Sequence, residues 1–361
     1  MTRIQLDQSS SKPAAVKRNL ILDSGAFSAW RLGKPVNLDQ YCDYILANKW
    51  ITNYVALDEI RPSDPEEAAR RSYENFRYMR NRGLEPIPVF HAGEDITWLF
   101  KMLDQKCSYI GLSASSLVSK NQVDEWYEMA WQYLVNRDGL PIVKVHAFGE
   151  GRENSLKRFP WYSADTSSAL VGTALGGRLI LPNRHVVSVR NDGASSMSSP
   201  NLRFMEEEDR KSLESILRKY HVRVEAFDKP NRVLETMVSY VGGLIYKEIE
   251  DNVRKDTTKF SGGYGFLSNT IPSDKPAVCD KTSFNLHLVP TTNHKAFPIL
   301  HALRCENILL SYFYIGLSGG TSFADLDLFI QDPDAFATIA ETKDRLNWRE
   351  TLSIIKEFTY A

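Results

Sequence analysis

Acidic and histidine residues recur at the ends of short apolar runs in the first half of this chain. These residues are Asp23, Asp58, His91, His146 and Asp165. Two carboxyl groups held at one site suit cleavage of a glycosidic bond, because one can attack the anomeric carbon while another handles the proton of the leaving group. The spacing therefore predicts a site built from the ends of several strands.

The stretch over residues 20–28 shows this pattern most clearly, because an apolar run ends abruptly in Asp23, Ser24 and Gly25. A buried parallel strand delivers polar groups in this way to the edge of an α/β sheet or barrel. A single acid there is also typical of an Asx turn, and a histidine could simply cap a strand end. Three acids that converge repel one another unless a cationic or hydrogen-bonding substrate lies among them, which favours a site.

Alternating strands and helices must position these residues. Six apolar runs alternate with helical patterns, of which the clearest span about 38–48, 63–83, 96–106 and 121–135. The second helix is expected to begin after an N-cap at Ser63. The first strand is not followed by a glycine-rich phosphate loop, so the dinucleotide-binding fingerprint is absent. The pattern predicts an α/β protein, with a (β/α)8 TIM-type barrel favoured over an open doubly wound sheet.

The pattern changes after Gly176. The elements expected there are a hairpin of residues 178–182 and 186–189, helices at 206–220 and 232–256, and irregular structure over 257–293. Residues 262–265, Gly-Gly-Tyr-Gly, form a glycine cluster inside the irregular part.

Four regions follow from these patterns. They are a flexible N-terminus over 1–17, the main part of the catalytic barrel over 18–190, an insertion over 191–293, and C-terminal helices over 294–361. The insertion is expected to be mostly helical and irregular and to contact nucleic acid, and the C-terminal helices are expected to complete and extend the barrel.

The composition is that of an ordinary soluble protein. The chain has 361 residues, of which 43% are hydrophobic, and a formal net charge of −1. This charge argues against a surface coated in positive charge but allows a local basic groove. The four cysteines have no paired spacing, and no apolar run is long enough to cross a bilayer. We expect a cytoplasmic protein without a membrane partner.

Five segments, in order along the chain, resemble motifs of the tRNA-guanine transglycosylases, which are (β/α)8-barrel enzymes. These segments are Leu22-Asp23-Ser24-Gly25-Ala26-Phe27, Ala56-Leu57-Asp58-Glu59, Ile110-Gly111-Leu112-Ser113, His146-Ala147-Phe148-Gly149 and Ser163-Ala164-Asp165-Thr166. The first is similar to the family's Asp-Ser-Gly-Gly-Phe-Gln motif, and the last stands where the family has its nucleophilic aspartate. Residues 178–181 and 187–191 resemble the segment after that nucleophile, and residues 297–309 resemble the family's C-terminal helix.

This resemblance implies a covalent mechanism that needs no cofactor or metal. Asp165 would attack the anomeric carbon of a guanosine nucleotide, and Asp23 would act as general acid and base on the departing and arriving bases. Asp58 would hold the hydrogen-bond donors of the base. The other residues expected to bind the substrate are Ser24, Gly25, Phe27, His91, Gly111, Leu112, Ser113, His146, Phe148 and Gly149.

The chain departs from the tRNA enzymes in one informative way, since their zinc cluster of three close cysteines and a distant histidine is missing. Cys279, His294, His301 and Cys305 match no standard zinc spacing, so we expect no zinc. The closer likeness is to the DNA-guanine transglycosylases of phages and bacterial genomic islands. The partners implied are DNA and a free 7-deazaguanine such as 7-cyano-7-deazaguanine, and a phage-encoded protein would act in the host cytoplasm.

Basic residues near the barrel rim are expected to contact the nucleic acid backbone. The candidates are Lys144, Arg152, Lys157, Arg158, Arg184 and Arg190. Each could instead be an ordinary solvated surface charge.

Three other functions remain open on the sequence. The protein could modify tRNA, as the better-known family members do, or it could be a glycoside hydrolase on a similar barrel. It could also be a non-catalytic, nucleic-acid-binding partner subunit, although the intact Asp23 and Asp165 argue against that reading.

Overall fold

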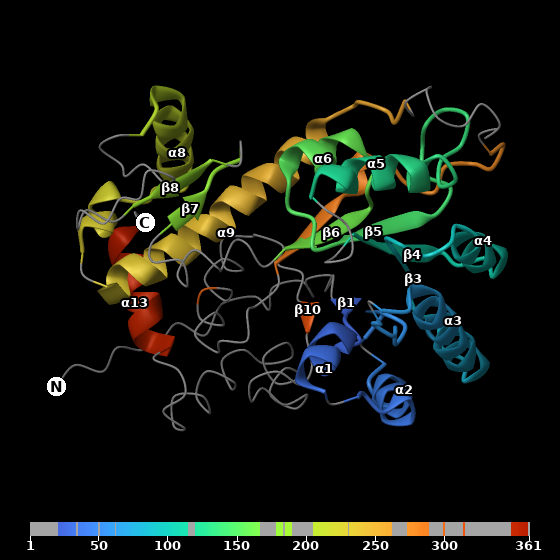
Figure 1. Ribbon diagram of the computed structural model, residues 1–361. Coiled ribbons are helices and arrows are strands. Elements are labelled where there is room, and N and C mark those ends of the chain that lie inside the picture. Colours follow the sequence, from blue (N-terminus) through green and yellow to red (C-terminus); the bar gives the residue numbers. More distant parts are fainter. Residues whose placement is uncertain are drawn as a thin grey trace, which may run out of the picture.

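The computed structural model places the elements that carry the predicted site (Figure 1). The residues that it describes are 21–33, 35–49, 51–61, 63–114, 120–166, 178–182, 185–189, 205–229, 231–261, 273–288, 299, 313–314 and 348–359. Predictions that concern 1–17, 262–265 or 297–309 as whole segments therefore lie outside the described residues.

The first half of the chain alternates strands with helices, as the sequence predicts. The elements are β1 (Ile21–Leu22), α1 (Ala26–Leu32), α2 (Leu38–Ala47), β2 (Asn53–Tyr54), α3 (Pro65–Asn81), β3 (Val89–His91), α4 (Thr97–Asp104), β4 (Tyr109–Ser113), α5 (Lys120–Trp131), β5 (Lys144–Phe148), α6 (Glu153–Arg158) and β6 (Ser163–Thr166). Helices α2, α3 and α4 lie along the outer side of the strands (Figure 1).

All strands of the central sheet run parallel. Five strands pair in the order β3-β4-β5-β6-β9, where β9 spans Asn285–Leu288. A second parallel group has the order β10-β1-β2, where β10 spans Phe313–Tyr314. A parallel bridge between Val55 and Ile87 joins β2 to the chain just before β3. The molecule is thus a mixed α/β protein with a central parallel sheet.

The irregular structure expected over 257–293 is contradicted by β9. This strand pairs with β6 along its whole length, and Asp165 lies opposite His287 in the register. The alternation of Leu286 and Leu288 with polar residues is a strand signal that favours this outcome. Part of the segment interpreted as an insertion therefore belongs to the central sheet.

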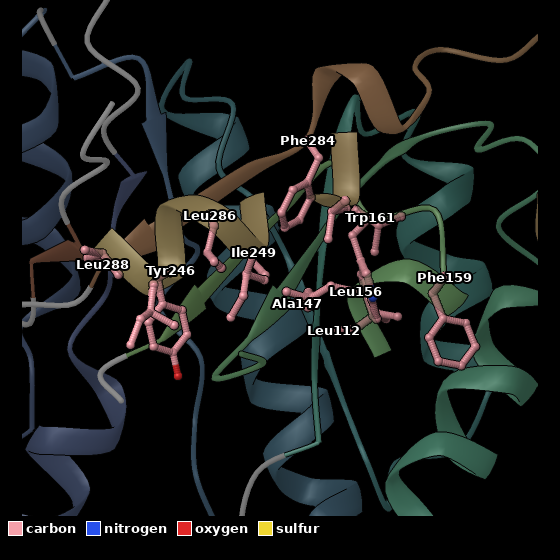
Figure 2. Close-up of a cluster of buried hydrophobic side chains, with 14 of the residues drawn as sticks. Leu112, Ala147, Leu156, Phe159, Trp161, Tyr246, Ile249, Phe284, Leu286 and Leu288 are labelled. Carbon is pink, nitrogen blue, oxygen red and sulfur yellow. The ribbon is translucent and has the colours of Figure 1, made fainter. Parts of the chain in front are cut away.

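Helix α9 (Asn231–Lys255) holds β9 in place. Glu250 is buried in this helix and accepts hydrogen bonds from the Leu286 backbone N–H (3.0 Å) and from Arg254 (3.1 Å). Ile249 of the helix and Leu286 of the strand belong to the same hydrophobic core, which Figure 2 shows at this point. The apolar contact and the buried hydrogen bond together fix the strand beside β6.

The other end of α9 packs against a separate group of elements. These are the antiparallel hairpin of β7 (Arg178–Ile180) and β8 (Val186–Ser188), α8 (Glu207–Lys219), the short 3-10 helix η1 (Val224–Asp228) and α13 (Trp348–Phe358). Figure 1 shows this group gathered at one end of the long helix. The hairpin and both long helices, α8 and α9, confirm the sequence predictions for this region.

Helix α3 begins one residue later than the sequence suggests, so the expected N-cap at Ser63 is wrong. Asp64 is the N-cap, and its carboxylate accepts from the Glu67 backbone N–H (3.1 Å). Pro65 occupies the first helical position, where its missing N–H costs nothing. The carboxylate of Asp64 also interacts favourably with the positive end of the helix dipole, which makes it the better cap.

The strands have two differently packed faces. Alternate residues of β1, β4, β5 and β6, such as Leu22, Ile110, Val145 and Ala164, join the large core beneath the helices. The residues between them line the other face, where Ile21, Val55, Ile87, Val89 and Tyr109 form a second, smaller apolar cluster. Because side chains alternate along a strand, this second face is the one that also carries the polar residues of the predicted site.

Within the described residues, the helices are all too short or too polar to span a membrane.

We predict that Leu286→Ala destabilises the protein by about 2–5 kcal/mol, because it leaves a cavity where β9 meets α9. Val278→Ala is the matched control: Val278 lies in the same segment but is 49% exposed, whereas Leu286 is 4% exposed. The control should change stability by less than about 0.5 kcal/mol in urea denaturation. Equal effects of both substitutions would contradict the placement of β9 in the core.

Candidate active site

The chain turns sharply after β1 and leaves Asp23 at the strand end. Gly25 is the N-cap of α1 and has φ of 75°, a left-handed conformation that suits glycine far better than other residues. Its carbonyl accepts from the Ala29 backbone N–H (2.9 Å), which starts the helix immediately. The turn points the helix away from the end of the strand, where the carboxyl group of Asp23 remains.

Asp23 is the electrostatic centre of the site. Burial of its carboxyl group, followed by the charges of Asp58 and Asp165, raises the pKa of Asp23 from 3.8 to about 8. The backbone amides of Ser24 and Gly25 oppose this shift but do not cancel it. Asp23 therefore keeps its proton at neutral pH, and the charges of the other two predicted acids contribute to this.

Asp58 is fixed by hydrogen bonds to both of its carboxylate oxygens. The Ser24 hydroxyl donates to Oδ1 (2.8 Å), and His91 Nε2 lies 3.1 Å from Oδ2. Burial disfavours the charged form of His91, but hydrogen bonds to Asp58 and Glu94 outweigh it and raise the pKa of His91 to about 10. His91 is thus a buried cation that links the ends of β2 and β3.

Asp165 lies on β6 rather than after it, and only one of its oxygens is held. Its Oδ1 accepts from the Gly149 backbone N–H (2.8 Å) and lies 3.2 Å from His146 Nε2. Gly149 has φ of 68°, which again favours glycine. The other oxygen, Oδ2, has no hydrogen bond to any residue that the structure describes.

The His146 ring is hydrogen-bonded to a chain of buried hydroxyl groups. Its Nδ1 hydrogen-bonds to the Ser163 hydroxyl, which in turn contacts the Tyr109 hydroxyl. The order serine, histidine, aspartate resembles that of a hydrolase triad, but Ser163 and His146 are completely buried. Ser163 therefore supports His146 and does not act as a nucleophile.

His287 packs beside this chain from β9. Its ring centre is 5.7 Å from that of His146. Burial and then the neighbouring His146 hold the pKa of His287 well below its ordinary value of 6.5, so His287 is neutral. A neutral ring here adds no further charge beside Asp165.

The predicted base-binding segment of β4 is partly committed to other contacts. The Gly111 backbone N–H donates to the Pro88 carbonyl (2.8 Å). A Cβ at Gly111 would lie 2.3 Å from the Phe148 ring, so glycine is needed there because Phe148 covers that face of the strand. The Leu112 side chain lies in the core beneath the helices. Ser113, by contrast, lies opposite both His91 and Phe148 in the sheet.

Phe27 projects from the first turn of α1, just beyond Asp23. Its side chain is exposed, and its ring centre lies 5.8 Å from that of the equally exposed Trp30. The position is compatible with the predicted contact to a substrate.

The described basic candidates contact partners within the chain. Lys144 lies at the opposite end of β5 from Phe148, with its Nζ 4.4 Å from the centre of the Tyr162 ring. Three others form ion pairs: Arg152 with Glu150 and Asp124, Lys157 with Glu153, and Arg158 with Asp124 and Glu128. Arg184 and Arg190 lie outside the described residues.

No group of three histidine, cysteine, aspartate or glutamate side chains within the described ranges is arranged to hold a metal ion. His294, His301 and Cys305 are not among those residues.

Sequence reasoning missed four residues that shape the site. They are Tyr109, Ser163, His287 and Glu94. The alternation of strand residues could have found two of them, because Tyr109 precedes Gly111 by two positions and Ser163 precedes Asp165 by two.

Comparison of the chain with protein-family models, with curated proteins and with solved structures finds no match.

We predict that Asp23→Asn stabilises the protein in a pH-dependent way. Below about pH 4 the carboxyl group is protonated in both the folded and the unfolded chain, so the substitution changes little. As the pH rises toward 8, the unfolded chain ionises while the folded protein keeps its proton. The wild-type protein then loses roughly 1.4 kcal/mol of stability per pH unit relative to the variant.

Thermal unfolding at a series of pH values tests this prediction, with Asp104→Asn at the exposed end of α4 as the control. A gain for Asp23→Asn that does not depend on pH would show that its carboxyl group has no raised pKa.

Proposed function

We propose that this protein is a guanine transglycosylase that exchanges guanine in DNA for a 7-deazaguanine through a covalent aspartyl intermediate. The observation that carries the proposal is the pairing of two unlike carboxyl groups. Among the described residues only one oxygen of Asp165 accepts a hydrogen bond, and Asp23, whose pKa the charge of Asp165 raises, keeps a proton at neutral pH. A nucleophile next to a general acid is the arrangement that glycosidic-bond cleavage with a covalent intermediate requires.

A (β/α)8 barrel is the architecture that we infer for the catalytic part. Parallel pairing runs in the order β10-β1-β2-β3-β4-β5-β6-β9, once the bridge between Val55 and Ile87 is included. In a flat sheet, β1 and β6 would lie roughly 24 Å apart, since five strand spacings separate them. Asp23 nevertheless senses the charge of Asp165. Curvature that brings β9 round toward β10 explains this proximity, and it supports closure of the sheet.

The proposed reaction has two balanced halves. In the first, Asp165 Oδ2 attacks the anomeric carbon, the bond from that carbon to the guanine nitrogen breaks, and Asp23 gives its proton to the departing guanine. In the second, the incoming 7-deazaguanine gives its proton to Asp23 while its nitrogen attacks the same carbon and releases Asp165. The pKa of about 8 suits Asp23 to both roles, because a group that titrates near the working pH can donate and accept protons.

Asp58 is the residue proposed to recognise the base through hydrogen bonds. Its carboxylate is held through both oxygens by Ser24 and His91, so it presents fixed acceptors to the two donors on the pairing edge of guanine. Each oxygen of a carboxylate can accept more than one hydrogen bond. The contacts that orient Asp58 therefore leave acceptor capacity for a base.

DNA is the proposed polymer because the chain resembles the DNA-modifying branch and lacks the clustered cysteines of the tRNA enzymes. A base in a duplex must leave the stack before it can reach a buried carboxylate, at a cost of a few kcal/mol. Unpaired or mismatched targets should therefore react faster than paired ones.

We predict that Asp165→Asn folds normally but forms no covalent adduct with a guanine-containing DNA oligonucleotide. The amide keeps the hydrogen bond from Gly149 but is not nucleophilic. Denaturing gel electrophoresis after incubation without added base measures the adduct. Asp58→Asn is the matched control, since it retains Asp165 and should still form the adduct, though more slowly. An adduct with Asp165→Asn would disprove the assignment.

We also predict that labelled guanine enters DNA, enters mismatched DNA faster than paired DNA, and enters tRNA weakly. Scintillation counting of each recovered polymer measures the exchange, and the Asp165→Asn variant supplies the background. Affinity for DNA should fall as salt rises, because phosphate contacts release counterions. Efficient exchange into tRNA with none into DNA would instead assign the protein to tRNA modification.

A further inference from the structure

Glu94, His91 and Asp58 form a continuous buried chain of charge at the ends of β2 and β3. His91 Nδ1 lies 3.0 Å from Glu94 Oε1, and His91 Nε2 lies 3.1 Å from Asp58 Oδ2. A neutral imidazole has only one N–H, whereas both ring nitrogens here face carboxylate oxygens. Only the doubly protonated ring can donate to both partners, so the geometry itself selects the cation.

The turn after β3 is built to bring Glu94 back onto His91. The second oxygen of Glu94, Oε2, accepts from the His91 backbone N–H (3.0 Å). Gly93 lies between them with φ of 98°, a conformation that other residues rarely adopt. The Glu94 side chain is only 3% exposed. Glu94 thus contacts both the ring and the backbone N–H of His91, and its side chain is shielded from solvent.

The contact between Glu94 and His91 affects Asp58, because His91 is hydrogen-bonded to both acids. His91 is the only cation whose contact with Asp58 is recorded among the described residues, and Ser24 supplies the other hydrogen bond. Asp58 also lies close enough to Asp23 to raise the pKa of that acid. Without a positive His91, no recorded cation among the described residues would contact Asp58, and both Asp58 and Asp165 lie close enough to Asp23 to affect it. The cationic ring therefore places a positive charge directly against Asp58.

We propose that Glu94 is a positioning residue, which holds His91 as an imidazolium so that the carboxylate of Asp58 is kept in a fixed position as an acceptor for the base. This inference rests on the proposed function, because it assigns Asp58 the reading of the base. Glu94 acts only through His91 and does not touch the substrate.

The groups in and around this unit come from five elements. Glu94 and His91 belong to β3 and its following turn, Asp58 follows β2, and Asp23 follows β1. Tyr41 of α2 faces the two aspartates. Burial, followed by their charges, raises the pKa of Tyr41 well above 10, so it stays neutral. The neighbouring strand β4 contributes Ser113, which does not titrate.

Glu94→Gln tests the proposal, because the amide has nearly the shape of the carboxylate but no charge. NMR of the histidine ring protons follows the titration of His91. We expect His91 in the wild-type protein to stay protonated up to about pH 9, and its midpoint in Glu94→Gln to fall by at least about one unit. Glu94→Asp, which restores the charge, should recover part of that shift, and Glu74→Gln on the exposed face of α3 should cause none.

Calorimetry with guanine supplies a readout that a merely structural role would not change. Asp23 titrates near pH 8 in both proteins, so the quantity compared is the ratio of the Glu94→Gln affinity to the wild-type affinity at each pH. This ratio should fall about tenfold as the pH passes the His91 midpoint of the variant, a factor that corresponds to one pKa unit. A uniform loss of affinity at every pH would overturn the proposal.

The two proposals fail in different ways. If the wild-type protein neither binds guanine nor exchanges it, the proposed function is wrong, whatever His91 does. If guanine exchange occurs but His91 loses its proton near pH 7 in the wild-type protein, the role assigned to Glu94 is wrong. The second measurement needs no variant, so it remains decisive even if Glu94→Gln does not fold.

Discussion

Repulsion among Asp23, Asp58 and Asp165 is the constraint on which the rest of the site depends. This repulsion is reduced in a different way at each acid. Asp23 keeps a proton, Asp58 lies against the cationic His91, and Asp165 accepts a hydrogen bond from the Gly149 backbone N–H. Three chemically identical side chains thereby acquire different properties. Such divergence between neighbouring carboxyl groups is what a reaction with separate acid and nucleophile needs.

The strands can hold the three acids in place because their two faces make different contacts. Residues such as Ile110 and Ala164 anchor the sheet beneath the helices, while Tyr109 and Ser163 on the opposite face support His146 under Asp165. A buried hydrogen-bonded chain of this kind restricts the imidazole to one orientation. Buried residues thus help to set the position of Asp165.

Long-range packing completes the site. Strand β9 covers the free edge of β6 and places His287 beside His146, and α9 holds β9 through Glu250 and Ile249. A strand from the second half of the chain therefore stabilises a site whose acids all come from the first half. This dependence explains why part of the segment after residue 190 is structural rather than an addition to a finished domain.

The sequence by itself determined the parallel α/β class, most helices and the convergence of the acids, because these follow from local periodicity and from the common edge at which parallel strands end. It did not determine the N-cap of α3, the strand β9 or the engagement of Arg152 and Lys157 with acids inside the chain. Only the tertiary structure decided those, together with which acid keeps its proton. Burial and the distances between charges arise from residues far apart in the chain, and no local pattern records them.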